Sequence, residues 1–186
     1  DNARVFINAE VYGNARIYND AKVYGNAKVY GYSKVFGNAR VHGNAQVYGL
    51  AKVFDNAEVY GNARIYNNAK VFVNAQVYDN AKVSGNTQVY ENAKVYENAK
   101  VFEDAEVFGI AEVCGNTEIR GDAEIRGDAE IASNSDYILF KNWWSSGRHF
   151  TWTKSNNMWK VGCFYGTGEE LIKKAYKDSE KSGREY

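Results

Sequence analysis

The chain has 186 residues, and its 23 Lys and Arg are balanced by 23 Asp and Glu. A net charge of zero gives no bulk attraction to nucleic acid or to an anionic membrane. No apolar run approaches the roughly 18 residues that a membrane span needs. We therefore expect neither nucleic acid nor a membrane as a partner.

Processing and localisation signals are sparse. The sequence opens with DNARVF, inside a repeat and without an initiator Met, so we expect it to begin within a longer native protein. It is rich in Asn but has no N-x-S/T acceptor, which favours a bacterial or phage protein of the cytoplasm over a secreted one. Cys114 and Cys163 are spaced unlike a metal knuckle or a disulfide framework, so we expect two reduced thiols and no cofactor.

The first two thirds of the chain repeat one hexapeptide. From Ala3 to Ala129 a small residue recurs every six positions, and Val or Ile follows two positions after each, which makes 22 hexads without insertion or deletion. The residue between the two is Lys, Arg, Gln or Glu in every hexad. Because alternate residues of a strand point to opposite sides, each hexad predicts a very short strand with an apolar inner face.

An aromatic residue follows most of the short strands, and after it come usually Gly and Asn. Gly tolerates a positive φ, and Asn tolerates the left-handed region better than most residues, so this pair predicts a corner. Three strands and three corners close a triangular coil, so that one coil is three hexads long. The absence of Pro fits this prediction, because Pro cannot donate to a hydrogen-bond ladder.

The column of Val and Ile, with the small column two positions before it, strongly resembles the bacterial hexapeptide-repeat family. The resemblance covers residues 1–135 and implies an all-β fold, a left-handed parallel β-helix. Twenty-two hexads give about seven coils, a rod roughly 34 Å long at the ~4.8 Å strand spacing. We assign this domain to residues 1–132.

Residues three hexads apart should stack on neighbouring coils, so each face has its own columns. Asn side chains at the corners are expected to form amide ladders along the axis. The three predicted aromatic columns are Tyr18, Phe36, Phe54, Phe72, Tyr90 and Phe108; Tyr12, Tyr30, Tyr48, Tyr66, Ser84 and Phe102; and Phe6, Tyr24, His42, Tyr60, Tyr78 and Tyr96.

Residues 133–186 change character and hold all four Trp. The runs DYILFK, RHFTWT and MWKVGCFY predict strands, and TGEELIKKAYKDSEKSG predicts a helix. Thr167 and Glu170 form the expected capping box, and the expected apolar stripe of the helix is Leu171, Ile172, Ala175 and Tyr176.

We predict that this β-β-β-α unit caps the solenoid, because an open end exposes unpaired backbone groups. It resembles the segment that follows similar NAxVY-type repeats in uncharacterised bacterial or phage proteins, a resemblance that implies no activity.

Hexapeptide-repeat folds often belong to acyltransferases that use acetyl-CoA or acyl carrier protein. The resemblance implies a catalytic His, a trimer with sites between subunits, and usually a loop that leaves the coil. This chain has only His42 and His149, and no insertion interrupts its hexads. We interpret His42 as a stacking substitute in an aromatic column. The related γ-type carbonic anhydrases need three His ligands, which the chain lacks.

Two surfaces of the repeat are candidates for binding. The column Tyr18, Phe36, Phe54 and Phe72 runs beside Arg16, Lys34, Lys52 and Lys70, which suits a polysaccharide or an anionic polymer. The structural alternative is that stacked rings stabilise neighbouring strands, and columns on all three faces favour it. Near Tyr30 and Tyr48, the corner residues Tyr32 and Leu50 form a candidate apolar interface.

Charge and the Trp-rich unit offer two further hypotheses. The basic column lies at one end of the repeat and successive Glu hexads at the other, which suits association of opposite ends or a solvated surface without a partner. In the C-terminal unit, Trp143, Trp144 and Arg148 suit a glycan or single-stranded nucleic acid, whose bases stack on aromatic rings. The alternative role of these large side chains is the core of the cap.

Together these patterns favour a rigid, non-enzymatic rod that serves as a scaffold, a spacer or an interaction surface. The expected partner is a protein, either a second copy or an N-terminal fusion partner. The first alternative is a polysaccharide-binding module that uses the stacked aromatics, and the second is an acyltransferase.

Overall fold

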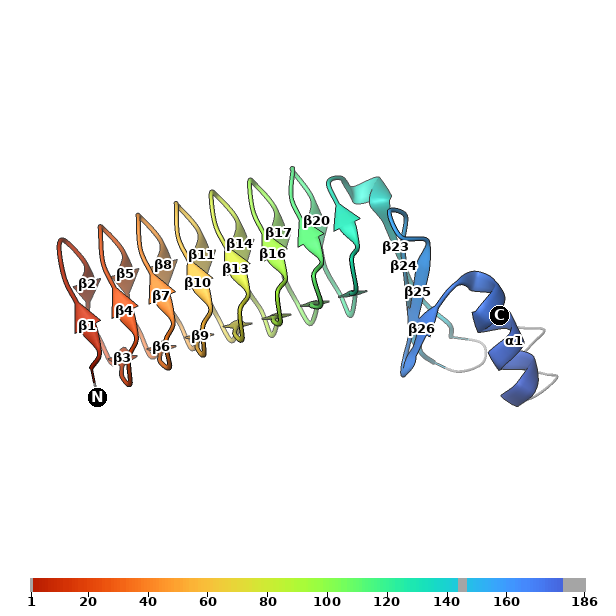
Figure 1. The fold of residues 1–186 in the computed structure, drawn as a ribbon, viewed down its shortest axis with the longest axis horizontal. Helices are drawn as coiled ribbons and strands as arrows, with labels where there is room; N and C mark the ends of the chain where they lie inside the picture. Colours follow the sequence, from red (N-terminus) through yellow and green to blue (C-terminus); the bar gives the residue numbers. More distant parts are fainter. Residues whose placement is uncertain (1, 144–146, 179–186) are drawn as a thin grey trace.

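The structure, a computed structural model, describes residues 2–143 and 147–178 of the chain. Strands β1 to β22, two residues each, wind into stacked triangular coils that form a rod (Figure 1). A four-stranded antiparallel sheet and helix α1 lie at one end of the rod. The predicted parallel β-solenoid of about seven coils, each three hexads long, with a C-terminal α+β cap is confirmed. The left-handed sense of the coil stays a prediction.

The solenoid has three faces, here named A, B and C, and each is a parallel sheet. Face A contains β1 (Arg4–Val5), β4 (Lys22–Val23), β7 (Arg40–Val41), β10 (Glu58–Val59), β13 (Gln76–Val77), β16 (Lys94–Val95), β19 (Glu112–Val113) and β22 (Glu130–Ile131). Face B contains β2 (Glu10–Val11), β5 (Lys28–Val29), β8 (Gln46–Val47), β11 (Arg64–Ile65), β14 (Lys82–Val83), β17 (Lys100–Val101) and β20 (Glu118–Ile119). Face C contains β3 (Arg16–Ile17), β6 (Lys34–Val35), β9 (Lys52–Val53), β12 (Lys70–Val71), β15 (Gln88–Val89), β18 (Glu106–Val107) and β21 (Glu124–Ile125).

The core follows from the register. Each strand pairs in parallel with the strand three hexads later, so that Val35 lies opposite Val53. Between residues 21 and 131, the inward-pointing small residues and the Val or Ile residues are fully buried. Full burial of one such Val or Ile side chain contributes about 1.5–3 kcal/mol. The inner face is therefore a continuous stack of methyl groups along the rod.

Asn side chains at the corners bond to one another, as predicted. One ladder runs through Asn8, Asn26, Asn44, Asn62, Asn80 and Asn98, with each amide nitrogen donating to the next amide oxygen at 3.1–3.3 Å. A second runs through Asn38, Asn56, Asn74 and Asn92. Since each step joins two neighbouring coils, these ladders fasten the corners as the strands fasten the faces.

The residue before each corner Asn takes a left-handed conformation. Gly supplies it at most corners, for example Gly109 with φ +79°. Val73 occupies the same corner column and is held at φ +61°. A β-branched side chain is a poor fit to this region, so the backbone is strained at Val73, as it is at Ile7 with φ +61°.

The cap begins with a 3₁₀ turn, η1 (Asn134–Asp136), and the antiparallel sheet follows. Its strands are β23 (Tyr137–Lys141), β24 (His149–Thr153), β25 (Met158–Val161) and β26 (Phe164–Gly166). The prediction of three strands was wrong: MWKVGCFY is a hairpin and not one strand. Gly162 adopts φ +54° and turns the chain at a point where the sequence pattern predicts that the strand continues.

Helix α1 spans Gly168–Asp178, and the rest of the predicted helix lies outside the described residues. The capping box is confirmed: the Thr167 backbone N–H donates to Glu170 at 2.8 Å, and the Glu170 backbone N–H donates to the Thr167 hydroxyl at 3.3 Å. Leu171 and Ala175 are buried, whereas the other half of the predicted stripe, Ile172 and Tyr176, is exposed. Among the described residues, no helix has the length and apolar character needed to cross a membrane.

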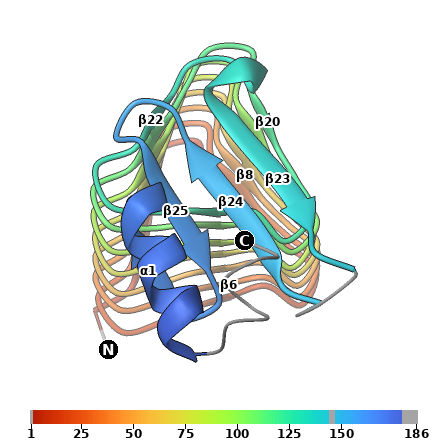
Figure 2. The same ribbon diagram turned by 90° about the vertical axis from the view of Figure 1, so that its right-hand side faces the viewer.

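The cap sheet lies across the end of the solenoid, with α1 on its outer side (Figure 2). Tyr137 and Leu139 of β23 point inward and pack against the solenoid core. On the outer side, Phe150, Val161 and Leu171 form a small separate core. The two-residue alternation of a strand thus gives the cap one face for the rod and one for its own helix.

We expect Val73→Gly to raise the free energy of unfolding by up to about 1 kcal/mol. The left-handed region costs a non-Gly residue about 1–2 kcal/mol, and the larger conformational entropy that Gly loses on folding offsets part of this gain. Urea denaturation followed by circular dichroism measures the change. Gly109→Ala in the same corner column is the matched control, and it should be destabilising, since its Cβ would lie 2.8 Å from the Gly127 backbone nitrogen. A Val73→Gly protein less stable than the parent would contradict the strain at this corner.

Candidate functional site

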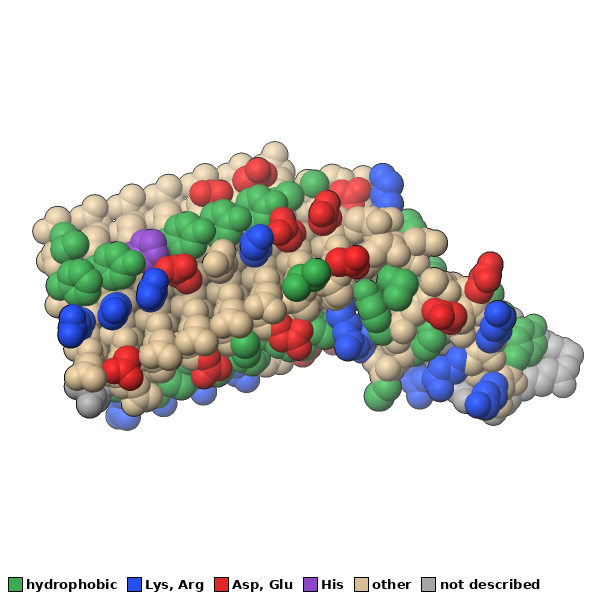
Figure 3. Space-filling view, viewed as in Figure 1, with side chains coloured by type: hydrophobic (Ala, Val, Ile, Leu, Met, Phe, Trp, Pro, Cys, Tyr) green, Lys and Arg blue, Asp and Glu red, His purple; other side chains and the backbone are tan. Residues whose placement is uncertain are grey.

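The predicted aromatic columns are ladders of stacked rings. Neighbouring ring centroids are 4.7–5.1 Å apart, and the planes lie within 12° of parallel. Figure 3 shows the ladder of face A running along the rod. The ladder of face C runs unbroken from Tyr18 to Phe108. On face B, stacking runs from Tyr12 to Tyr66, and the next position in the column is the buried Ser84.

This stacking determines what the rings offer to a ligand. Inside a ladder both faces of a ring are covered by its neighbours, so only ring edges remain for contact with a ligand. A sugar stacked flat on a ring needs an uncovered face, which only the end of a ladder provides. At the C-terminal end of the face C ladder, the outer face of Phe108 is also covered. The Arg126 guanidinium carbon lies 5.4 Å from the Phe108 ring centroid and 5.0 Å from that of Tyr165.

The two histidines occupy structural positions. His42 stacks between Tyr24 and Tyr60 at centroid distances of 4.7 and 5.1 Å, which confirms it as a stacking substitute. Its Nε2 lies 3.5 Å from a Glu58 carboxylate oxygen. His149 on β24 lies 3.3 Å from Asp122 across the junction between cap and rod. Within residues 2–143 and 147–178 no group of three His, Cys, Asp or Glu could hold a metal ion.

Two tyrosines of the ladders, Tyr78 and Tyr90, have hydroxyl pKa values above the ordinary value. Burial raises the pKa of Tyr78 to about 12. Burial, together with the Glu106 carboxylate that accepts a hydrogen bond from the Tyr90 hydroxyl, also raises the pKa of Tyr90. These groups are therefore hydrogen-bond donors and not bases.

Outward-pointing charges pair between coils on faces A and B. Lys28 bonds to Glu10 at 3.1 Å, Lys94 to Glu112 at 2.8 Å and Lys100 to Glu118 at 2.7 Å. The hydrogen bond from Lys94 holds the pKa of the Glu112 carboxyl below its ordinary value, and Lys100 does the same for Glu118. Each pair joins equivalent positions of neighbouring coils, which places opposite charges in register on successive strands.

Face C departs furthest from this arrangement, although Arg4 and Lys22 on face A and Arg64 and Lys82 on face B also make no ion pair with any described residue. Its outward column begins with Arg16, Lys34, Lys52 and Lys70, and none of the four makes an ion pair with any described residue. Two unit charges about 5 Å apart in water repel by about 0.8 kcal/mol before salt screens them. The column therefore concentrates positive charge that the fold itself does not neutralise.

The glutamates later in the same column already have partners within the molecule. Glu106 accepts hydrogen bonds from Gln88 at 3.0 Å and from the Tyr90 hydroxyl at 3.2 Å. Glu124 pairs with Lys160 of the cap at 2.7 Å. The two halves of face C are thus unlike: the acidic half is used within the molecule and the basic half is not.

The predicted apolar patch lies on the corner that leads into face C. Tyr32 and Leu50 are 63% and 55% exposed. They replace Asn between Asn14 and Asn68, so the amide ladder of this corner is interrupted there. Each lies two positions before a lysine of the basic column, which makes the patch a border of that column.

At the C-terminal end, side chains of the cap take over the hydrogen bonds of a missing coil. Within the stack, a backbone N–H donates to a carbonyl of the next coil, as that of Glu106 does to Ala123 at 2.8 Å. In the last coil, the equivalent N–H groups of Glu118, Glu124 and Glu130 donate instead to cap side chains. Their acceptors are Asn134, Thr151 and Ser155, at 2.7, 3.1 and 2.7 Å.

Acceptors at this end are satisfied in the same way. The Tyr137 hydroxyl donates to the Glu118 carbonyl at 2.8 Å, and the Tyr165 hydroxyl donates to the Arg126 carbonyl at 3.3 Å. Unpaired backbone groups at a sheet edge invite pairing with another chain. The cap therefore closes this end of the rod with side-chain donors and acceptors.

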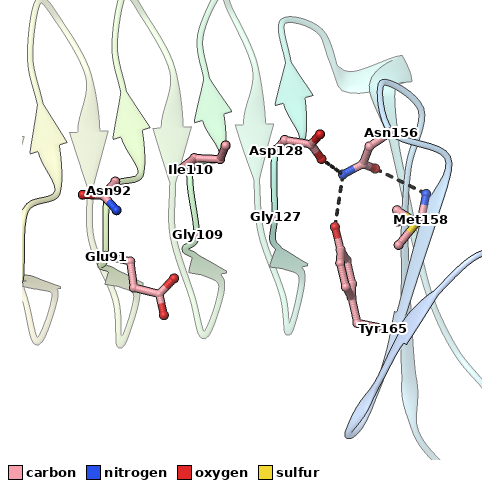
Figure 4. A pocket seen from close by; sticks show the side chains of 9 residues that line it. All are labelled: Glu91, Asn92, Gly109, Ile110, Gly127, Asp128, Asn156, Met158 and Tyr165. Carbon is pink, nitrogen blue, oxygen red and sulfur yellow. Dashed lines mark hydrogen bonds between the residues drawn. The ribbon is translucent and has the colours of Figure 1, made fainter.

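An open groove of about 590 Å³ lies where the cap meets the rod (Figure 4). The Asn156 amide nitrogen donates to Asp128 at 3.0 Å and to the Tyr165 hydroxyl at 3.2 Å, and its oxygen accepts from the Met158 backbone at 3.3 Å. The polar groups at the cap side are thus engaged in joining cap to rod. We interpret the groove as a seam of the fold, bordered by the exposed Ile110.

The tryptophan-rich surface is only partly described. Trp143 is 76% exposed, and the Lys141 ammonium lies 4.0 Å from its ring centroid. Trp144 lies outside the described residues, and Arg148 is exposed. Trp159 packs against the core of the cap. Binding by Trp143, Trp144 and Arg148 stays a prediction.

Thr151→Val should lower the free energy of unfolding by about 1–3 kcal/mol, because it leaves the Glu124 N–H without its acceptor at the cap junction. Thermal denaturation followed by circular dichroism measures this change.

Thr117→Val provides a matched control. The Thr117 hydroxyl is the buried side-chain polar atom that has no hydrogen-bond partner among the described residues, so the same substitution should be neutral or stabilising there. Equal losses in the two variants would contradict the role of Thr151 as a replacement for a coil carbonyl.

Comparisons with known proteins agree with the repeat. The model of the family described as "YdcK Beta solenoid repeat" matches residues 75–91, which is less than one coil. No curated protein matches the chain. Among solved structures, a candidate acetyltransferase of Bacillus cereus is similar at 11% sequence identity and a TM-score of 0.32, with 95% of this chain and 88% of that chain covered. A likeness at this level carries no information about activity.

The repeat itself is therefore the basis of classification. Twenty-two consecutive hexads form stacked parallel coils with a buried small-residue column and a buried Val or Ile column. The chain folds as a β-solenoid of stacked hexads, closed at its C-terminal end by an α+β cap.

Proposed function

We propose that this protein is a rigid, non-enzymatic rod that acts as a scaffold or spacer and displays interaction surfaces along its length. The observation that carries the proposal is the uninterrupted stack of hexads from β1 to β22. No loop leaves the coils over this range to enclose a substrate. The interior between residues 21 and 131 is filled with small and branched side chains.

Stiffness follows from the distribution of the contacts. Backbone ladders run on all three faces, amide ladders run along corners and ring ladders lie outside the strands. Bending the rod would separate neighbouring coils on one side, and this would stretch the backbone, amide and ring ladders of that side together. Each stacked ring pair contributes about 0.2–1 kcal/mol on its own, and the repetition multiplies that contribution.

The proposed partner of the rod is a protein, either a second copy of the chain or an N-terminal fusion partner.

The acyltransferase alternative finds little support in the surroundings of His42. Both faces of its ring are covered by Tyr24 and Tyr60, and the acid beside it, Glu58, also pairs with Arg40. A general base must reach the proton of a bound substrate. If the protein hydrolyses or transfers the acyl group of acetyl-CoA, and His42→Ala but not His149→Ala abolishes this turnover, the rod proposal is overturned.

Deletion of residues 56–73 removes one whole coil and should leave a folded rod, because every later column keeps its register. Small-angle X-ray scattering should show the maximum dimension shortened by about 4.8 Å. Deletion of Asn62 alone is the control. It should cause a large loss of stability, since a shift of one residue turns every later side chain to the wrong side. Similar unfolding by both deletions would contradict the stacked-coil scaffold.

A further inference from the structure

The first four coils of face C carry positive charge that the molecule leaves unneutralised. Arg16, Lys34, Lys52 and Lys70 lie in register on successive strands. Elsewhere the same outward position holds ion pairs between coils, such as Lys28 with Glu10 and Lys94 with Glu112. Unpaired cations also lie in register on face A (Arg4 and Lys22) and on face B (Arg64 and Lys82), but only in runs of two. The run of four on face C is therefore the longest among the described residues.

The ring ladder beside these cations adds to the attraction for anions. Its members Phe36, Phe54 and Phe72 stack at 4.8–4.9 Å and so turn their edges to the surface. The edge of an aromatic ring is the positive end of its quadrupole, whereas the face is negative. Phe also has no hydroxyl, so these edges are apolar CH groups. The ladder thus borders the cation column with a surface that suits both an anion and an apolar group.

The opposite border is formed by Tyr32 and Leu50. Both are exposed, and both stand where the neighbouring coils carry Asn. In coils two and three, the lysine of each face C strand is therefore flanked by an exposed corner residue, Tyr32 or Leu50, and by a phenylalanine. The cation column spans three coil steps, roughly 15 Å at the spacing of parallel strands.

We propose that this basic half of face C binds an acidic polysaccharide lengthwise along the rod. Carboxylate or sulfate groups of successive sugars pair with Arg16, Lys34, Lys52 and Lys70. The apolar faces of the sugar rings contact the phenylalanine edges on one side and Tyr32 and Leu50 on the other. Regular charge spacing on the rod calls for a ligand with regularly repeated charges, and a linear acidic glycan has them.

Single-stranded nucleic acid fits the same surface less well. Its sequence-tolerant binding depends on bases stacked on aromatic faces. In the ladder of face C those faces are covered by neighbouring rings. The proposal goes beyond the role as a rod, and the rod stands whether or not the face binds a glycan.

The test uses dextran sulfate as the probe, with neutral dextran of the same chain length as its control. Binding to the full chain is measured by isothermal titration calorimetry at two salt concentrations. We expect dextran sulfate to bind, more weakly at the higher salt because exposed charge pairs are screened, and neutral dextran not to bind.

Substitution of the three lysines by Gln, Lys34→Gln with Lys52→Gln and Lys70→Gln, should weaken binding about tenfold. Gln88 occupies the same column, so the fold accommodates Gln there. The matched control, Lys22→Gln with Arg64→Gln and Lys82→Gln, removes the same charge from faces A and B and should change the affinity about twofold or less.

A second variant tests the apolar border without changing charge. Tyr32→Asn with Leu50→Asn restores the residue of the neighbouring coils, so it should remain folded and bind dextran sulfate a few-fold more weakly. Absence of binding by the parent, or equal weakening in both charge variants, would overturn the proposal. Tighter binding of an oligothymidine, lost in the face C variant, would overturn it in favour of nucleic acid.

Discussion

The whole rod depends on one constraint: parallel strands stack in register after every third hexad. Val35 lies on Val53 and Lys34 on Lys52, so each position of a coil generates a column along the axis. The contribution of a residue to stability therefore depends on how well it packs against the equivalent residue of the next coil. Val and Ala satisfy the constraint by filling the interior, Asn by bonding its amide to the next amide, and Phe and Tyr by stacking rings at the spacing of the strands.

Charged residues are the exception, because like charges repel when stacked. The chain handles this differently in its two halves. In the later coils Lys94 and Lys100 stand opposite Glu112 and Glu118, and Glu106 and Glu124 have partners of their own. The early coils of face C keep four cations in line. The same backbone geometry thus carries ion pairs between some of the later coils and, on face C, a run of four unpaired cations on the early coils.

Most of the rod could be predicted from the sequence because the pattern that determines it is local and repeats every six residues. Period, inward columns, ring ladders and amide ladders all follow from the spacing of hexads along the chain. The hairpin of the cap and its contacts with the rod could not be predicted in this way. Its hairpin depends on one turn at Gly162. The hydrogen bonds that join the last coil to Thr151, Ser155 and Tyr137 depend on how two unlike units dock. A run of strand-forming residues carries no sign of such contacts, although an excess of Thr and Ser near the end of a solenoid is a signal that could be sought.

In a fold where repetition satisfies the structure, departures from the repeat carry the information about function. The consensus hexad already explains its own Val, Ala, Asn and aromatic residues, so none of these needs a ligand. Tyr32 and Leu50 interrupt an amide ladder, and the four cations of the basic column make none of the ion pairs that occur at some positions of the other columns. Each departure gives up stabilisation that the neighbouring coils retain, and both lie on the same face within the same coils. Their coincidence is the reason to place the binding surface there and not on the equally aromatic faces A and B.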